Sequence, residues 1–229
     1  MEIKGFQKIT LLDFPGKVAC TIFTPGCNFR CPFCHNASLV MRSDEGDSFS
    51  EEEIFRYLQK RKGILDGVAV TGGEPMLMKD LPAFLGRVHE LGFATKVDTN
   101  GSFPDKLRQV IEDGLVDYVA MDIKNSKEKY PATIGVPAVD MAKICESVEL
   151  LKQNRIPYEF RTTVVKGFHE PEDFTKIGEW ISGTPHYYLQ AFKDSGDVLG
   201  EGCDSFSPDE MEAFAAIVRP YVGEVALRG

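Results

Sequence analysis

Three cysteines lie close together near the start of this 229-residue chain: Cys27, Cys31 and Cys34. Thiolates are nucleophiles and metal ligands, so this spacing predicts a site for a metal or an inorganic cluster. A fully extended segment carrying them would reach roughly 24 Å or more. The three sulfurs can therefore meet one small inorganic group only if the chain curls around it as a loop. Gly26 and Pro32 suit such a loop.

Three inorganic groups compete for these thiols. A closed zinc site needs four ligands, commonly in two well-separated pairs, whereas the other cysteines are scattered singly, at Cys20, Cys145 and Cys203. The string Cys31-Pro-Phe-Cys34-His35 matches the haem-attachment pattern. Haem attachment requires export, and the N-terminal residues lack the basic and apolar regions of an export signal. An iron–sulfur cluster held by three thiolates would keep one iron open for a ligand.

The spacing C-x3-C-x2-C, with Phe33 before the last cysteine, resembles the motif of radical S-adenosylmethionine (SAM) enzymes. Two strings narrow the resemblance, Asp13-Phe-Pro-Gly16 and Pro25-Gly-Cys-Asn-Phe-Arg-Cys-Pro-Phe-Cys-His-Asn36. They are similar to the activating enzymes of glycyl-radical proteins, most of all to activators of anaerobic ribonucleoside-triphosphate reductase. The resemblance extends over about residues 1 to 192. It implies a [4Fe–4S] cluster on the three thiolates, with SAM bound at its open iron.

The resemblance also implies the residues that bind SAM. Gly72-Gly73-Glu74-Pro75 is similar to a family motif at the methionine end of SAM. A buried Glu74 carboxylate would suit the SAM ammonium group, because burying either charge alone is costly. The other implied contacts are Phe33 and His35 at the adenine, Asp98 and Thr99 at the mouth, Asp122, Lys124 and Arg161 at later strands, and Gln190, where some relatives carry a histidine. Asp98 and Asp122 together are also candidates for binding a monovalent cation.

These motifs have interpretations without function as well. Gly-Gly-Glu-Pro and Asp98-Thr-Asn-Gly101 are compatible with ordinary turns. Asp122 and Lys124 are two residues apart, so on a regular strand they face the same way and can form a surface salt bridge. Arg161 can be a surface charge. Cys20 and Cys145 are predicted to be packing residues, and the role of Cys203 stays open.

The elements that must position these residues alternate between strand and helix. Strands are predicted at 18–24, 67–71, 94–98, 116–124, 157–165 and 186–192, with a short closing strand at 222–227. Helices are predicted at about 51–62, 79–91, up to 113, 141–154, 171–181 and 208–218, the first with a capping box at Ser50. Residues 42–47 and 125–140 are predicted to be a polar exposed segment and an irregular one. His169 is predicted to be exposed and Trp180 buried.

This alternation predicts an α/β fold with parallel strands. The resemblance makes it an open (β/α)6 partial barrel in a single domain, 1–229. Its core would be about 18–192, followed by a C-terminal helix and short strand at about 205–229. In such barrels chemistry gathers at the C-terminal ends of the strands, where the thiol loop and the other motifs fall.

Composition narrows the class of protein. The chain has 26 basic and 35 acidic residues, a net charge of −9, which disfavours non-specific binding to nucleic acid. It contains no apolar run long enough to span a membrane. Six cysteines in a chain of 229 residues do not form the framework of a secreted disulfide protein. We expect a cytoplasmic protein.

The resemblance implies a radical reaction. An electron from a flavodoxin-type donor would cleave SAM into methionine and a 5′-deoxyadenosyl radical. That radical would take a hydrogen atom from a glycine of a partner glycyl-radical enzyme. The alternatives are an activator of the pyruvate formate-lyase type, a radical SAM enzyme acting on a small molecule such as a deazapurine synthase, and a non-catalytic metal-binding module. The partner, the oligomeric state and the natural electron donor do not follow from the sequence.

Overall fold

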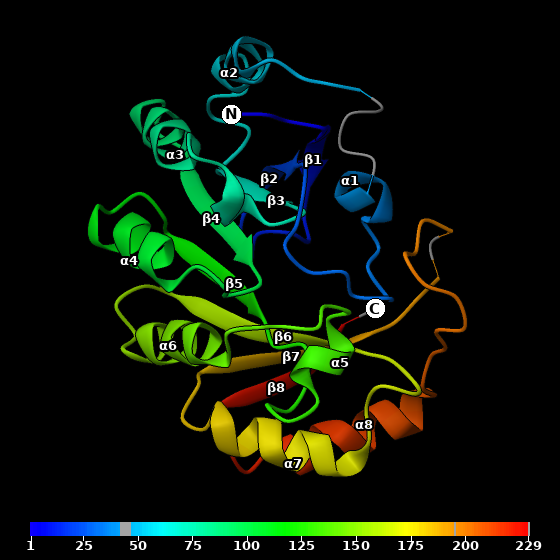
Figure 1. Ribbon diagram of the computed structural model, residues 1–229. Helices are drawn as coiled ribbons and strands as arrows, with labels where there is room; N and C mark the ends of the chain where they lie inside the picture. The colour runs from blue at the N-terminus through cyan, green and yellow to red at the C-terminus, as the bar shows by residue number, and fades with distance from the viewer. Residues whose placement is uncertain (42–46, 195, 229) are drawn as a thin grey trace.

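The computed structural model describes residues 1–41, 47–194 and 196–228. The predicted polar segment 42–47 lies outside these residues except for Asp47, which is exposed. One curved sheet of eight strands runs through the molecule in the order of the chain (Figure 1). The strands are β1 (Gly5–Thr10), β2 (Ala19–Thr24), β3 (Gly67–Gly72), β4 (Ala94–Thr99), β5 (Tyr118–Asp122), β6 (Tyr158–Val164), β7 (His186–Ala191) and β8 (Glu224–Arg228).

The helices α2, α3, α4, α6 and α7 follow one another along the outer face of the sheet in Figure 1. The helices are α1 (Ala37–Met41), α2 (Glu51–Gln59), the 3-10 helix η1 (Pro75–Leu77), α3 (Leu81–Glu90), α4 (Pro104–Glu112), α5 (Tyr130–Thr133), α6 (Met141–Lys152), α7 (Pro171–Trp180) and α8 (Pro208–Val218). The capping box at Ser50 and Glu53 forms as predicted.

The strands β2 to β8 pair in parallel. Six of them, β2 to β7, are the predicted parallel strands, and β8 continues the sheet at the position of the predicted closing strand. The sheet is not closed, because β1 and β8 each pair on one side only. The predicted α/β fold with an open parallel sheet is therefore confirmed.

β1, the 3-10 helix η1 and two short α-helices were not predicted. β1 pairs antiparallel with β2, and its register shifts between Gln7 and Thr10. Its burial pattern has no clean alternation, because its centre is exposed at an edge of the sheet. α1 and α5 have only five and four residues, too few to show a helical period in the sequence.

Alternation along each strand separates the core from the functional face. In β6, Phe160 and Val164 are fully buried in the hydrophobic core, whereas Arg161 and Thr163 line a cavity on the concave face. Successive side chains of a strand point to opposite faces, so one face packs on helices while the other stays polar. No helix in the described ranges is both long and apolar enough to span a membrane.

Two single residues test the burial predictions. Trp180 is buried as predicted, with 8% of its surface exposed. The prediction for His169 is wrong, because its side chain is only 2% exposed. It packs between Phe33 and Phe174, with ring centroids 6.5 Å and 5.8 Å away. A histidine in a loop gives no signal of the aromatic cluster that later folds around it.

Candidate functional site

A cavity of about 390 Å³ opens at the C-terminal ends of the parallel strands. Its walls come from the thiol loop, residues 25–36, and from the ends of β2 to β7. Every residue that the sequence predicted for the site lines this cavity except Glu74: Cys27, Cys31, Phe33, Cys34, His35, Gly72, Gly73, Asp98, Thr99, Asp122, Lys124, Arg161 and Gln190. The structure thus brings together side chains that are up to 163 positions apart, from Cys27 to Gln190.

The thiol loop is fixed by contacts with its neighbours rather than by regular structure of its own. Gly26 accepts a hydrogen bond from Glu74 N at 2.8 Å, and Arg30 N donates to Ile134 O at 2.8 Å. Gly73 needs to lack a side chain, because a Cβ there would lie 1.8 Å from Gly26 O. The glycine pair after β3 therefore serves to let the loop approach the strand end closely.

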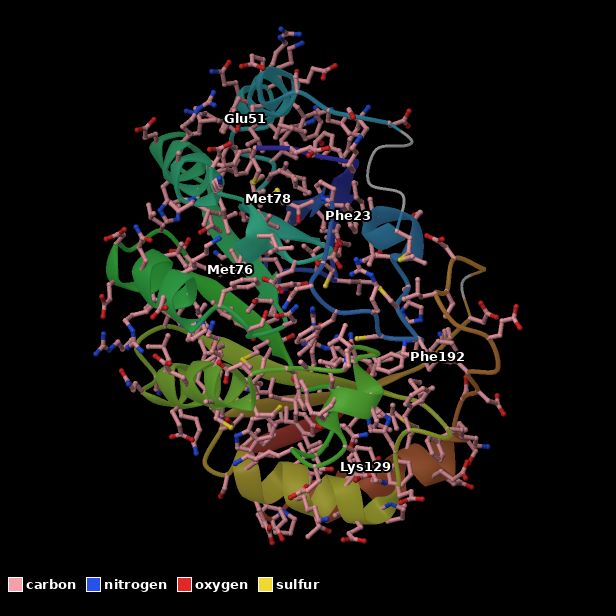
Figure 2. The ribbon with its side chains drawn as sticks, viewed as in Figure 1. Phe23, Glu51, Met76, Met78, Lys129 and Phe192 are labelled. Carbon is pink, nitrogen blue, oxygen red and sulfur yellow. The ribbon has the colours of Figure 1, made fainter. Side chains whose placement is uncertain are left out.

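The far end of the thiol loop is held by a segment after β7. His35 Nε2 lies 2.7 Å from Lys193 O, and its ring stacks on Phe192 with centroids 5.4 Å apart (Phe192 is labelled in Figure 2). Gly200 N donates to Pro32 O at 2.7 Å. The predicted adenine contacts thus occupy fixed places: His35 is stacked, and Phe33 packs on Phe168 with centroids 5.5 Å apart.

The three thiols form no disulfide and interact electrostatically with one another. All six cysteines of the chain are free. Burial raises the pKa of Cys27 to about 11 and that of Cys31 to about 12, and the neighbouring thiols add to both shifts, while Lys124 opposes them. The thiols of Cys27 and Cys31 are therefore protonated at neutral pH when no metal or cluster is bound. Binding of a metal or cluster here would release protons.

The donor set suits an iron–sulfur cluster better than a single ion. Within the described ranges no three His, Cys, Asp or Glu side chains form a group that could hold a metal ion. The three sulfurs nevertheless border one cavity. Three thiolates spaced around a hollow fit the corners of a larger inorganic group.

A chain of alternating charges crosses the cavity wall from β4 to β6. Arg161 Nη2 lies 3.0 Å from Asp98 Oδ2, and Arg161 Nε donates to Asp122 Oδ1 at 2.6 Å. Lys124 Nζ donates to Asp122 Oδ2 at 2.9 Å, and Lys96 pairs with Asp98. Burial alone would raise the pKa of both carboxyls, but the cations outweigh it and hold both pKa values below the usual range. The two aspartates are thus ionised.

Asp98 and Asp122, the residues predicted to bind a monovalent cation, are joined by Arg161. Its guanidinium bridges the two carboxylates, and the monovalent cation stays a prediction. The sequence could not show this bridge, because the three residues belong to three separate strands. Asp122 and Lys124 do form the expected pair, but in the cavity wall and only 24% and 16% exposed, not on the open surface.

Glu74 does not line the cavity, and its predicted place at the methionine end of SAM stays a prediction. It is fully buried and accepts hydrogen bonds from Met76 N at 3.0 Å, Thr99 Oγ1 at 2.8 Å and Asn100 N at 2.7 Å. Burial raises its pKa to about 7, although these donors oppose the shift. Glu74 therefore ties the turn after β3 to the end of β4 from behind the cavity wall.

Sequence reasoning missed several residues of the wall. Thr163 of β6, Thr21 and Phe23 of β2 and Asn100 all line the cavity. Asn100 belongs to the Asp98-Thr-Asn-Gly101 motif, so this motif could have indicated that Asn100 is a residue of the site. The others could have been found from alternation, because they fall on the same faces as predicted residues or their paired neighbours.

Comparison with known proteins gives independent support for a cluster site at the thiol loop. Residues 21–181 match the family model described as the radical SAM superfamily. A chain of Methanocaldococcus jannaschii, provisionally named a glycyl-radical enzyme activating enzyme, is 31% identical over 99% of this chain and 95% of its own length. The pyruvate formate-lyase-activating enzyme of Listeria monocytogenes is 30% identical over 81% of this chain and 77% of its own length.

Solved structures share the fold. Streptococcus suis SuiB, crystallised with S-adenosylmethionine, superposes with a TM-score of 0.70 at 14% identity, over 91% of this chain and 52% of that one. At this identity the match shows the fold alone. It places the open sheet described above among proteins of known architecture.

Proposed function

Because the chain belongs to the radical SAM superfamily, we propose that it activates a glycyl-radical enzyme with a [4Fe–4S] cluster and SAM as cofactors. The observation that carries this proposal is the convergence of three thiols and the SAM-motif residues on one cavity. Similarity to named activating enzymes over almost the entire chain supports the choice of reaction. Cys27, Cys31 and Cys34 are the proposed cluster ligands.

Cys27, Cys31 and Cys34 would hold the cluster, which would pass on an electron from an external donor, and SAM would supply the group that takes a hydrogen atom from a glycine. The residues of this chain bind and orient the cluster and SAM. The cavity volume of about 390 Å³ falls in the range of small-molecule sites. Gly72 and Gly73 let the thiol loop pack closely against the end of β3, and Phe33 and His35 offer aromatic faces for the adenine.

The charged wall suits the amino-acid end of SAM. Asp122 and Asp98 are ionised and able to accept from an ammonium group, and Lys124 and Arg161 are able to donate to a carboxylate. Their mutual pairing fixes their positions before SAM arrives, so little side-chain order is lost on binding. This support does not depend on Glu74, whose carboxylate is used elsewhere.

The open sheet suits a protein substrate. β1 and β8 do not pair with each other, so the barrel is open on one side. This opening gives a polypeptide access to the concave face. We propose anaerobic ribonucleoside-triphosphate reductase as the partner, supported by the N-terminal strings around Asp13 and the thiol loop. Pyruvate formate-lyase is the second candidate, because named activators of that enzyme are 30% identical to this chain. A flavodoxin-type protein is the proposed electron donor.

The test is anaerobic reconstitution followed by addition of dithionite and SAM. We expect release of 5′-deoxyadenosine, and a glycyl radical in the electron paramagnetic resonance spectrum only when a partner is present. Candidate partners are compared side by side. Release of 5′-deoxyadenosine without any protein radical would favour a small-molecule substrate, and absence of release would favour a non-catalytic module.

The ligand assignment has its own test. Changing Cys27, Cys31 or Cys34 to Ala should remove the cluster's iron and abolish 5′-deoxyadenosine release, because each thiolate is one of only three ligands. Cys145→Ala is the matched control, since this thiol lies on α6 away from the cavity lining. Iron content and product are measured on all four variants. SAM cleavage by a variant lacking all three thiols would disprove the assignment.

A further inference from the structure

Three polar side chains form a closed ring beside Cys27. Asn100 Nδ2 donates to Asn28 Oδ1 at 2.9 Å, and Asn28 Nδ2 donates to Ser102 Oγ at 2.9 Å. Ser102 Oγ donates to Asn100 Oδ1 at 2.5 Å and completes the ring. The ring joins the thiol loop to the end of β4, two segments more than 70 positions apart in the sequence.

The orientation of the Asn100 amide follows from its backbone partner. Ser102 N, which can only donate, lies 3.0 Å from Asn100 Oδ1. The oxygen of the amide must therefore face Ser102, and the NH₂ group must face the other way. The backbone of Asn100 is fixed too, because its own N–H donates to the buried Glu74 at 2.7 Å.

The NH₂ group directed in this way reaches a thiol. Asn100 Nδ2 lies 3.7 Å from Cys27 Sγ, within hydrogen-bond distance for sulfur, and Phe29 N lies 3.4 Å from the same atom. Across the described residues, Cys31 and Cys34 have no such donor to their sulfurs, so Cys27 is electronically distinct. Asn100 itself is only 6% exposed.

We propose that Asn100 is a positioning residue that raises the reduction potential of the cluster through its hydrogen bond to the Cys27 sulfur. Adding an electron to a cluster makes its sulfur ligands more negative, and a hydrogen-bond donor stabilises that state more than the oxidised one. Hydrogen bonds to the sulfurs are among the factors that set such potentials. The inference rests on the proposed function only in taking Cys27 as a ligand.

The test is a potentiometric titration of the reconstituted protein without SAM or partner, followed by electron paramagnetic resonance. Asn100→Leu and Asn100→Asp both remove the donor, and Asp keeps the acceptor for Ser102 N. We expect both variants to have a more negative midpoint potential than the wild type, with Asp shifted further by its charge. Asn28→Ala is the control, because it opens the ring but leaves Asn100 oriented by Ser102, and its potential should stay unchanged.

Two results would overturn the proposal. An unchanged midpoint potential in both Asn100 variants would show that the hydrogen bond to Cys27 does not tune the cluster. Loss of the cluster from both Asn100 variants, while Asn28→Ala retains it, would make Asn100 a structural residue of the loop. Because the titration contains neither SAM nor a partner, its outcome is independent of which reaction the protein catalyses.

Discussion

At the scale of single residues, Arg161 decides the charge balance of the cavity. It bridges Asp98 and Asp122, and all three side chains are largely withdrawn from solvent. Arg161→Met would leave the two carboxylates with one lysine each and no shared cation. Breaking a buried ion pair by removing one partner costs about 3–5 kcal/mol, so we expect the free energy of unfolding, measured in urea, to fall by about that amount.

An exposed arginine provides the comparison for Arg161. Arg155 is 52% exposed and lies 3.3 Å from Glu112. A surface pair of this kind contributes about 0–1 kcal/mol, so Arg155→Met should change stability little. Equal effects of the two substitutions would show that the Arg161 network does not stabilise the fold.

His169 should make stability depend on pH. Burial lowers its pKa, although hydrogen bonds to the backbone oppose the shift. Val165 N donates to Nδ1 at 3.2 Å, so the neutral ring carries its proton on Nε2, which lies 2.9 Å from Lys124 O. Asp173 favours and Lys129 opposes the charged ring. The folded state therefore binds this proton more weakly than the unfolded state.

Because the folded pKa lies below the ordinary value near 6.5, the stability due to neutral His169 is present above that pH. It is lost as the pH falls through the folded pKa. In His169→Gln this loss between pH 7.5 and 5 should be smaller, measured as unfolding free energy at each pH. His186→Gln, at a half-exposed histidine, should keep the wild-type pH dependence. A wild-type slope in His169→Gln would contradict the assignment.

At the scale of elements, the contact between β3 and the thiol loop depends on Gly73. Gly73→Ala would place a Cβ 1.8 Å from Gly26 O, and backbone must move to relieve it. We expect a loss of at least about 2 kcal/mol in stability and a clear loss of iron after reconstitution. Gly92, with a positive φ of 88° and open space around it, is the control. Gly92→Ala should cost about 1 kcal/mol and keep its iron, and a Gly73→Ala protein with full iron content would contradict this account.

The same elements show what sequence could predict. Short segments rich in apolar and β-branched residues mark the strands, so β2 to β7 were predicted within about two residues of their observed bounds. Their order along the chain then placed the site at one edge. β1 was missed because an edge strand with an exposed centre has no such segment. The hydrogen bonds of Glu74 could not be predicted, because its partners, Thr99 and Asn100, come from another strand end.

At the scale of the whole molecule, the folded state of the sheet should not depend on the bound cofactor, whereas the order of the thiol loop should depend on it. The parallel strands form their hydrogen bonds without help from the cavity, whereas the thiol loop is irregular and encloses it. Removing iron with a chelator should leave the far-ultraviolet circular dichroism unchanged. Cleavage by trypsin after Arg30, measured by mass spectrometry, should become several times faster, because metal binding stabilises the folded loop. Equal cleavage of the two forms would show that the loop is rigid by itself.

The contacts of the thiol loop also set the order of events when the protein is made. Arg30 bonds to Ile134, and Pro32 and His35 bond to Gly200 and Lys193. Nearly seven-eighths of the chain must therefore be synthesised before every segment that contacts the thiol loop is present. We therefore expect iron and sulfide to be delivered only after β7 has been translated.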